Sequence, residues 1–351
     1  MKILPGPVRQ KVRKSCGPLV QILGHKTWLM QLSSSLLGKI EGAIVLMYHS
    51  VADDHNVEWV DPANHVPADI FARQMEFLAS KRKVVALDEL VSTLQQGKTP
   101  DAGTMAITFD DGYLDNLTVA APILERYKLP ATLFLPTGYI DRGENQWVDQ
   151  AYSAFKFRSK SQLSWGSDAA TTFNLDDPKQ YRAGYRAVCD ELLRAAAAER
   201  KALLDKLNEQ LRPTSRPPRL TMNWDEVRTL VNKHRGFQIG GHTLEHTDLS
   251  TVSEEQAQKE LTICAQRIKE ELGVRPRHFS FCYGRTSESL RRLAAAAGFE
   301  AACGGEGLDP VIKAPADLLR LPRVAGPASM RRFDLLTSAA NTGIWRRLGR
   351  R

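Results

Sequence analysis

The feature that most constrains the fold of this sequence is a regular alternation of short apolar runs with segments of helical periodicity. Runs typical of buried strands occur at 44–48, 84–85, 105–109, 131–135, 237–240, 279–281 and 299–303, with a further one expected at 319–321. Helical spacing of apolar residues is found at 67–78, 87–94, 115–127, 224–233, 253–272 and 287–297. Strands that alternate with helices form parallel sheets. About seven such units predict an α/β fold, a closed or nearly closed (β/α) barrel.

The alternation stops between about residues 141 and 221, where we expect a largely helical insertion. Residues 181–211 are rich in Ala, Leu, Glu, Lys and Arg, which favour helix, and prolines at 213, 217 and 218 end the segment. The sequence therefore divides into three parts. These are a basic, partly helical N-terminal extension (1–43), a barrel with its insertion (44–325) and a basic C-terminal tail (326–351).

The charge of the chain is concentrated at its ends. The 351 residues carry a net charge of +8, in an otherwise ordinary globular composition that is 42% hydrophobic and 25% charged. The basic ends indicate either solvated tails or peripheral contact with an anionic membrane surface. No nucleic-acid-binding motif accompanies this charge, so binding to DNA or RNA is not expected.

The cysteines and the hydropathy pattern bear on the cellular location. Five cysteines without a C-x-x-C pair suggest neither a disulfide framework nor a cysteine zinc site, and a reducing compartment fits best. No run of 18 apolar residues occurs, and a signal peptide is not evident in the first 45 residues. A cytoplasmic location is expected, with the inner face of the membrane as a place of action.

Side chains able to do chemistry follow four of the predicted strands. They are His49 after 44–48, Asp110 and Asp111 after 105–109, His242 after 237–240 and Tyr283 after 279–281. Taken alone, Asp-Asp-Gly and Tyr-Gly are usually turns, and His-x-x-x-His is usually a surface or packing pair on a helix. Because a parallel barrel brings the C-terminal ends of its strands to one edge, the combination favours a shared site.

Two imidazoles and two carboxylates in this set predict metal chemistry. His242 and His246 are four residues apart, the spacing of one helical turn. One carboxylate and two histidines form a metal site with positions left open for water and substrate. The remaining carboxylate of the Asp110-Asp111 pair is then available as a general base. This pattern indicates a metal-assisted hydrolase.

With these motifs the chain resembles the polysaccharide deacetylase (NodB-homology) family of carbohydrate esterases. The resemblance rests on Thr108–Gly112, Gly240–His246 and Phe279–Gly284, and it covers roughly residues 44–325. Tyr48–Ser50 is similar to a branch of the family that acts on poly-N-acetylglucosamine and other exopolysaccharides. The resemblance implies a distorted (β/α) barrel.

Carried over by position, the resemblance implies a role for each residue of the site. Asp111, His242 and His246 would hold a divalent metal, with zinc expected and cobalt or nickel as alternatives. Asp110 would be the general base, and the backbone N–H of Tyr283 would donate to the oxyanion. The implied substrate is an N-acetylglucosamine-type polysaccharide or lipid-linked saccharide, which loses its N-acetyl group as acetate.

The sequence departs from the family pattern in the third motif. Cys282 stands where many members have proline, and Ser280 replaces the arginine that would hold the base. Because proline fixes φ, this loop is expected to be looser. We expect Arg323 to orient Asp110 instead.

Two further residues are left with two interpretations each. Many members use a histidine near the C-terminus as general acid, but this chain has none after His278. His49 is therefore the candidate acid, with a structural role as the alternative. Trp147, at the start of the insertion, either stacks on a sugar or belongs to a core.

Two other functions compete with deacetylation. The first is a catalytically impaired, carbohydrate-binding member of the same fold, in which Asp110 and Asp111 would be dispensable. The second is a non-haem iron oxygenase, since two histidines and one carboxylate also describe that site. Its jelly-roll scaffold would appear as short antiparallel strands, which the helix-rich alternation does not favour.

Overall fold

The computed structural model describes residues 40–338, except 55, 167–170 and 306–307. Nearly all of the predicted N-terminal extension, and the predicted tail from residue 339 onward, therefore lie outside the described residues. The prediction that the extension is partly helical concerns these residues and also lies outside the described ranges.

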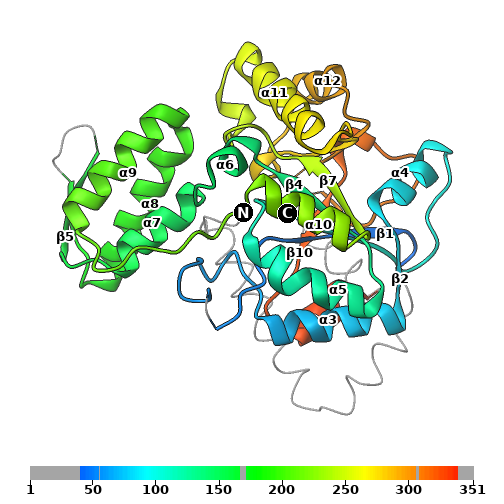
Figure 1. Cartoon of the computed structure of the whole chain (residues 1–351), viewed down its shortest axis with the longest axis horizontal. Coiled ribbons are helices and arrows are strands. Elements are labelled where there is room, and N and C mark those ends of the chain that lie inside the picture. Colours follow the sequence, from blue (N-terminus) through cyan, green and yellow to red (C-terminus); the bar gives the residue numbers. More distant parts are fainter. Residues whose placement is uncertain (1–39, 55, 167–170, 306–307, 339–351) are drawn as a thin grey trace.

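A parallel sheet curls into a nearly closed barrel at the centre of the molecule (Figure 1). Its seven principal strands run in the order β10-β1-β3-β4-β7-β8-β9, and the short β2 pairs with β3. The strands are β1 (Ala43–Tyr48), β2 (Lys83–Val84), β3 (Thr104–Phe109), β4 (Ala131–Leu135), β7 (Phe237–Gly241), β8 (His278–Ser280), β9 (Ala301–Cys303) and β10 (Arg323–Ala325). A parallel bridge between Cys303 and Leu321 joins the β9 edge to the segment that enters β10. The predicted (β/α) barrel is confirmed.

Buried apolar side chains explain why these segments become strands. In β1 the first four residues are completely buried, and every residue of β3 is buried. Strands covered on both faces are typical of parallel sheets packed under helices. The helices around the barrel are α3 (Ala68–Lys81), α4 (Leu87–Gln95), α5 (Ala121–Tyr127), α6 (Thr137–Arg142), α10 (Trp224–Lys233), α11 (Glu254–Leu272), α12 (Glu288–Ala296) and α13 (Met330–Leu336). A π-helical turn, η1 (Asn116–Ala120), precedes α5.

The last strand does not lie where the sequence predicted it. Residues 318–320 form a 3-10 turn, η4 (Leu318–Arg320), because the Asp317 carboxylate accepts a hydrogen bond from the Leu319 amide at 3.0 Å. Leu321 only bridges to β9, and β10 begins at Arg323. This shift places Arg323, rather than a leucine, at the start of the strand beside β1.

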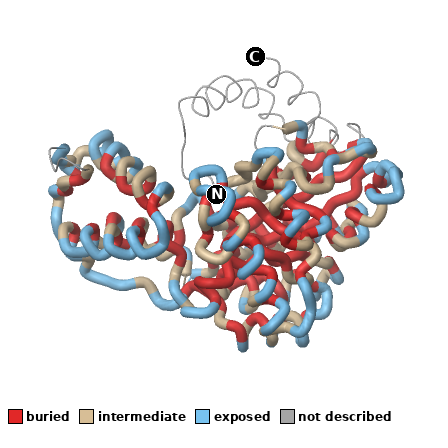
Figure 2. The backbone as a smooth tube through the Cα atoms, turned by 90° about the horizontal axis from the view of Figure 1, so that it is seen from above, coloured by how far each residue is buried: buried red, intermediate tan, exposed pale blue. Residues whose placement is uncertain are grey.

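The insertion forms a lobe beside the barrel, with a core of its own (Figures 1 and 2). It contains α7 (Trp147–Lys156), an antiparallel hairpin of β5 (Gln162–Trp165) and β6 (Thr171–Asn174), and the helices α8 (Pro178–Arg194) and α9 (Ala197–Leu211). The sequence predicted continuous helix over 181–211, but Ala195 and Ala196 adopt extended backbone and separate α8 from α9. The hairpin was not predicted.

The first part of the predicted C-terminal tail packs on the barrel. Phe333, on α13, is completely buried, and its ring lies edge-on to Phe77 of α3 with centroids 6.0 Å apart. Across the described ranges, no helix combines the length and the apolar character that crossing a bilayer requires.

We expect Phe333→Ala to lower the free energy of unfolding by about 3 kcal/mol, because it removes a fully buried ring and leaves a cavity. Urea denaturation measures this change. Arg332→Ala, at the neighbouring exposed position, is the matched control and should have little effect. Equal stability of the two variants would show that α13 contributes nothing to the core.

Candidate active site

The two adjacent aspartates are brought to the barrel edge by a sharp turn after β3. Asp111 has φ 74° and Gly112 has φ 67°, so two successive residues adopt left-handed backbone. Aspartate tolerates this conformation better than most residues, and such strain is concentrated at functional sites. Asp110 and Asp111 are each only 2% exposed. The turn therefore presents two buried carboxylates at the C-terminal edge of the sheet.

Asp110 is held by Arg323, as the sequence led us to expect. Nη1 of Arg323 donates to one carboxylate oxygen at 2.8 Å and Nη2 to the other at 2.5 Å. The same guanidinium donates to the hydroxyls of Thr108 at 3.1 Å and Ser280 at 2.7 Å. Ser280 is the residue that replaces the expected arginine. The arginine is thus supplied from β10, and the serine on β8 helps to seat it.

This ion pair sets the charge of Asp110. Burial alone would raise the pKa of the carboxyl, but the Arg323 guanidinium, with His242 and His49 nearby, holds that pKa at about 2. Asp110 is therefore ionised at neutral pH, which is the form that can accept a proton.

Asp111 lies against the two imidazoles that the sequence paired with it. Its Oδ1 is 3.4 Å from Nε2 of His242 and 3.1 Å from Nε2 of His246, and it is buried without a hydrogen-bond partner. Bonds of about 2.0–2.2 Å from nitrogen and oxygen to a shared ion would produce separations of this size. An orphaned carboxylate oxygen facing two imidazoles therefore fits a divalent metal.

Hydrogen bonds on the other ring nitrogens orient both imidazoles. Nδ1 of His242 lies 2.7 Å from the Ser280 carbonyl oxygen, which can only accept, so this nitrogen carries the proton. Nδ1 of His246 lies 3.1 Å from the hydroxyl of Tyr283. Such outer partners fix the tautomer and direction of metal-binding histidines. Both rings present Nε2 to Asp111.

The segment that carries His242 and His246 is a loop, and the predicted helical turn is wrong. Thr243 has φ 68° and His246 has φ 50°, which no right-handed helix contains. The buried carboxylate of Glu260, on α11, accepts from the amides of Leu244 and Glu245, both at 2.9 Å, and so takes the place of a helical hydrogen-bond ladder.

Two arginines from other elements bind the loop that carries His242 and His246. Arg142, on α6, forms a two-pronged ion pair with the Glu245 carboxylate at 2.8 Å per bond. Arg200, on α9 of the insertion, donates to the Glu245 carbonyl at 2.9 Å and is only 3% exposed. The insertion therefore takes part in holding the residue next to His246.

The sequence reasoning did not identify Arg200 and Glu260. A signal for both was present, since each is a charged residue on the apolar face of a helix. Glu260 shares its face with Ala257, Leu261 and Cys264, and Arg200 shares its face with Leu204 and Leu207. A charge at such a position is rarely buried without a partner.

Cys282 and Tyr283 occupy a short 3-10 turn after β8, η3 (Cys282–Gly284). Tyr283 has φ 61°, and its ring packs against the core of the insertion. Sγ of Cys282 is 3.5 Å from the His242 carbonyl oxygen and 3.8 Å from Nδ1 of the same residue. The third motif therefore lies directly against the two imidazoles.

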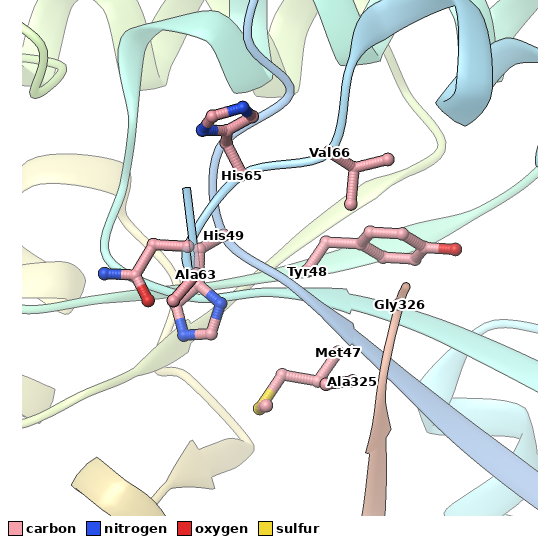
Figure 3. Close-up of a pocket in the computed structure, with 9 residues that line it drawn as sticks. Met47, Tyr48, His49, Ala63, His65, Val66, Ala325 and Gly326 are labelled. Carbon is pink, nitrogen blue, oxygen red and sulfur yellow. The ribbon is translucent and has the colours of Figure 1, made fainter. Parts of the chain in front are cut away.

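His49 lies at the end of β1, beside a small pocket (Figure 3). The rings of Tyr48 and His49 point to different sides of the strand end, and the Tyr48 hydroxyl donates to Gln74 at 2.8 Å. Burial lowers the pKa of His49 to about 3, although Asp111 and Asp110 are near enough to oppose the shift. The imidazole is therefore neutral at pH 7.

Trp147 is part of a core. It has no exposed surface, belongs to the buried cluster of the insertion, and lies under the Arg200 guanidinium at 5.7 Å from the ring centroid. The structure therefore favours the core interpretation of Trp147 over stacking on a sugar.

A second buried carboxylate, Asp149 on α7, lies behind the Asp-Asp-Gly turn. One oxygen accepts from the Tyr113 hydroxyl at 2.9 Å, while Oδ1 has no partner, and the side chain is completely buried. Burial therefore raises the pKa of Asp149 well above its ordinary value, with the charge of Asp111 acting in the same direction.

We expect Asp149→Asn to gain stability relative to the unchanged chain as the pH rises. The raised pKa means that the folded state binds the proton more tightly, so the contribution of Asp149 falls once the pH exceeds its unfolded pKa of about 4. Asparagine cannot titrate. Urea denaturation at several pH values between about 4 and 8 measures the difference, with exposed Asp176→Asn as control. A pH-independent difference would contradict the argument.

The sequence matches a known protein family and a curated protein. The sequence profile described as polysaccharide deacetylase matches residues 97–302. A curated protein of Bacillus subtilis (strain 168), named "Putative polysaccharide deacetylase YxkH", is 34% identical over 92 residues, which is 26% of this chain and 30% of that protein. The chain thus matches less than a third of the length of this relative.

Solved structures share the fold. The Streptococcus pyogenes deacetylase PplD, solved with acetate, aligns with a TM-score of 0.55 at 16% identity, covering 86% of this chain and 98% of that one. IcaB from Ammonifex degensii aligns with a TM-score of 0.51 at 16% identity, covering 87% and 98%. At this identity the likeness concerns the fold alone. The profile match spans more than half of the chain, and the chain therefore belongs to the polysaccharide deacetylase family.

Proposed function

We propose that this chain is a metal-dependent hydrolase that removes N-acetyl groups from an N-acetylglucosamine-type polysaccharide or lipid-linked saccharide. One observation carries the proposal. The orphaned Oδ1 of Asp111 faces Nε2 of His242 and of His246, while the second carboxylate, Asp110, is ionised beside it. Membership of the polysaccharide deacetylase family supports an acetylated carbohydrate as substrate.

Asp111, His242 and His246 are the residues that would hold the ion. When bound, a divalent metal supplies a Lewis acid that polarises the acetamide carbonyl and lowers the pKa of water. An oxygen and two nitrogens suit zinc, cobalt and nickel alike. Zinc remains our first expectation, since its preferred ligands include both groups.

Asp110 would remove the proton from the attacking water. The bidentate bonds to Arg323 keep its carboxylate charged and fix its direction, so little reorganisation is needed during proton transfer. The Tyr283 amide is the proposed donor to the oxyanion. The left-handed backbone at Tyr283 sets the direction of that amide, and the packing of its ring on the insertion supports this backbone.

His49 is the proposed acid for the departing amine. Because its imidazole is neutral at pH 7, His49 must gain a proton during the reaction before it can give one to the nitrogen. Its closeness to Asp110, which collects the proton of the water, is consistent with such a relay. The alternative is that His49 has only a structural role.

The two competing functions make different demands on the structure. A jelly-roll oxygenase needs antiparallel strands, whereas all strand pairs described in the barrel are parallel. A binding protein without catalysis needs Asp110 only for its ion pair with Arg323 and not as a base, so acetate release separates the two functions. The predicted membrane contact depends mainly on basic residues outside the described ranges. Cell fractionation tests both this contact and the proposed cytoplasmic location.

We expect the purified chain to release acetate from N-acetylglucosamine oligomers when zinc, cobalt or nickel is added. Asp111→Ala should lose metal and activity together, and Asp110→Asn should keep metal but lose at least about a hundredfold in turnover. Asp225→Ala, exposed on α10, is the control. Absence of release by the unchanged chain, or full release by Asp111→Ala, would refute the proposal.

We expect His49→Ala to lower turnover by about a hundredfold or more with little change in metal affinity, because it removes a proton donor but no ligand. Steady-state acetate release and metal titration are the two measurements. Turnover close to that of the unchanged chain would leave His49 with a structural role only.

A further inference from the structure

Cys282 places a thiol against both imidazoles of the proposed metal centre. The ligand atoms of Cys282, His242 and His246 lie within 4.8 Å of one another, and all three residues are buried. The sequence suggested no cysteine zinc site, because the cysteines show no paired spacing. The fold creates the cluster instead, by bringing the turn after β8 next to the loop after β7.

The two imidazoles therefore face two different donors. On one side is the orphaned carboxylate oxygen of Asp111, 3.1 Å from His246 and 3.4 Å from His242. On the other is the sulfur of Cys282, which lies 3.8 Å from the opposite ring nitrogen of His242, Nδ1. Carboxylate oxygen is a hard donor and thiolate is a soft one, so the two sets differ in the ions they prefer.

We propose that Cys282, His242 and His246 form a second, thiolate-containing donor set that takes thiophilic ions such as Cd²⁺. The inference rests on the proposed metal centre, whose imidazoles it shares. Because this set uses both imidazoles of the proposed metal centre, a thiophilic ion bound there takes the place of the catalytic ion and blocks hydrolysis.

A small movement of the thiol is part of the proposal. Nδ1 of His242 is engaged by the Ser280 carbonyl, so the ring offers Nε2 to an ion, and the sulfur must turn toward that nitrogen. The present contacts of Sγ are long, at 3.5 Å to the His242 carbonyl and 3.6 Å to the Thr243 hydroxyl. Thiols are weak hydrogen-bond partners, so these contacts are easily exchanged for a metal bond.

Titration of the metal-free full chain with Co²⁺ alone tests the inference. A cobalt–thiolate bond gives a charge-transfer absorption in the near ultraviolet. We expect this band in the unchanged chain and its loss in Cys282→Ser, which keeps the size of the side chain. Cys303→Ser changes a buried thiol on β9 outside the cluster and should retain the band.

Affinities give an independent measurement. We expect Cys282→Ser to weaken Cd²⁺ binding about tenfold or more while Mn²⁺ binding changes less than about twofold, because manganese prefers oxygen ligands. Circular dichroism checks that the variant folds. If Co²⁺ binds without the band and the Cd²⁺ affinity is unchanged in the variant, the second donor set is refuted and the Asp111 centre stands. If no Co²⁺ binds at all, both fall.

Discussion

The ion pair between Arg323 and Asp110 is the interaction on which the rest of the site depends. It joins the start of β10 to the end of β3. Arg323 also donates to Thr108 on β3 and to Ser280 on β8, so three strands are linked. Burying two charges costs several kcal/mol unless their hydrogen bonds are well made, and here the guanidinium makes four. Loss of either partner would leave an uncompensated buried charge between β10 and the end of β3. The pair therefore supports closure of the barrel and the charge of the base together.

Backbone strain is concentrated around this join. Among the described residues, six residues other than glycine have positive φ, and four of them are Asp111, Thr243, His246 and Tyr283. Strain of this kind persists only where surrounding contacts determine the conformation. Glu260, Arg142 and Arg200 supply those contacts for the loop of His246. The strained residues are thus the ones whose side chains must converge from separate strands.

Much of this arrangement could be predicted from the sequence, because apolar runs and helical spacing report burial directly. The strand ends that carry His49, Asp110 and His242 lie where predicted, and the contact of Arg323 with Asp110 is present. The spacing of His242 and His246 predicted a helical turn that is not present, because a loop with two left-handed residues can also bring two imidazoles together. Glu260 and Arg200 are visible in the sequence only as charges on apolar helix faces, which does not identify their partners. The contact of Cys282 with the imidazoles is a tertiary contact that no local pattern encodes.

The position of Arg200 has a consequence for how the molecule can vary. Its guanidinium donates to three carbonyl oxygens, on Leu192, Ala195 and Glu245. One buried cation therefore binds the C-terminal end of α8, the junction between α8 and α9, and the loop of the barrel that carries His246. If the lobe moved away from the barrel, Arg200 would lose its bond to Glu245 and remain a buried charge without that partner, beside Trp147. Lobe and barrel should therefore unfold in one cooperative step. A change of length at the junction between α8 and α9 should therefore destabilise lobe and barrel together.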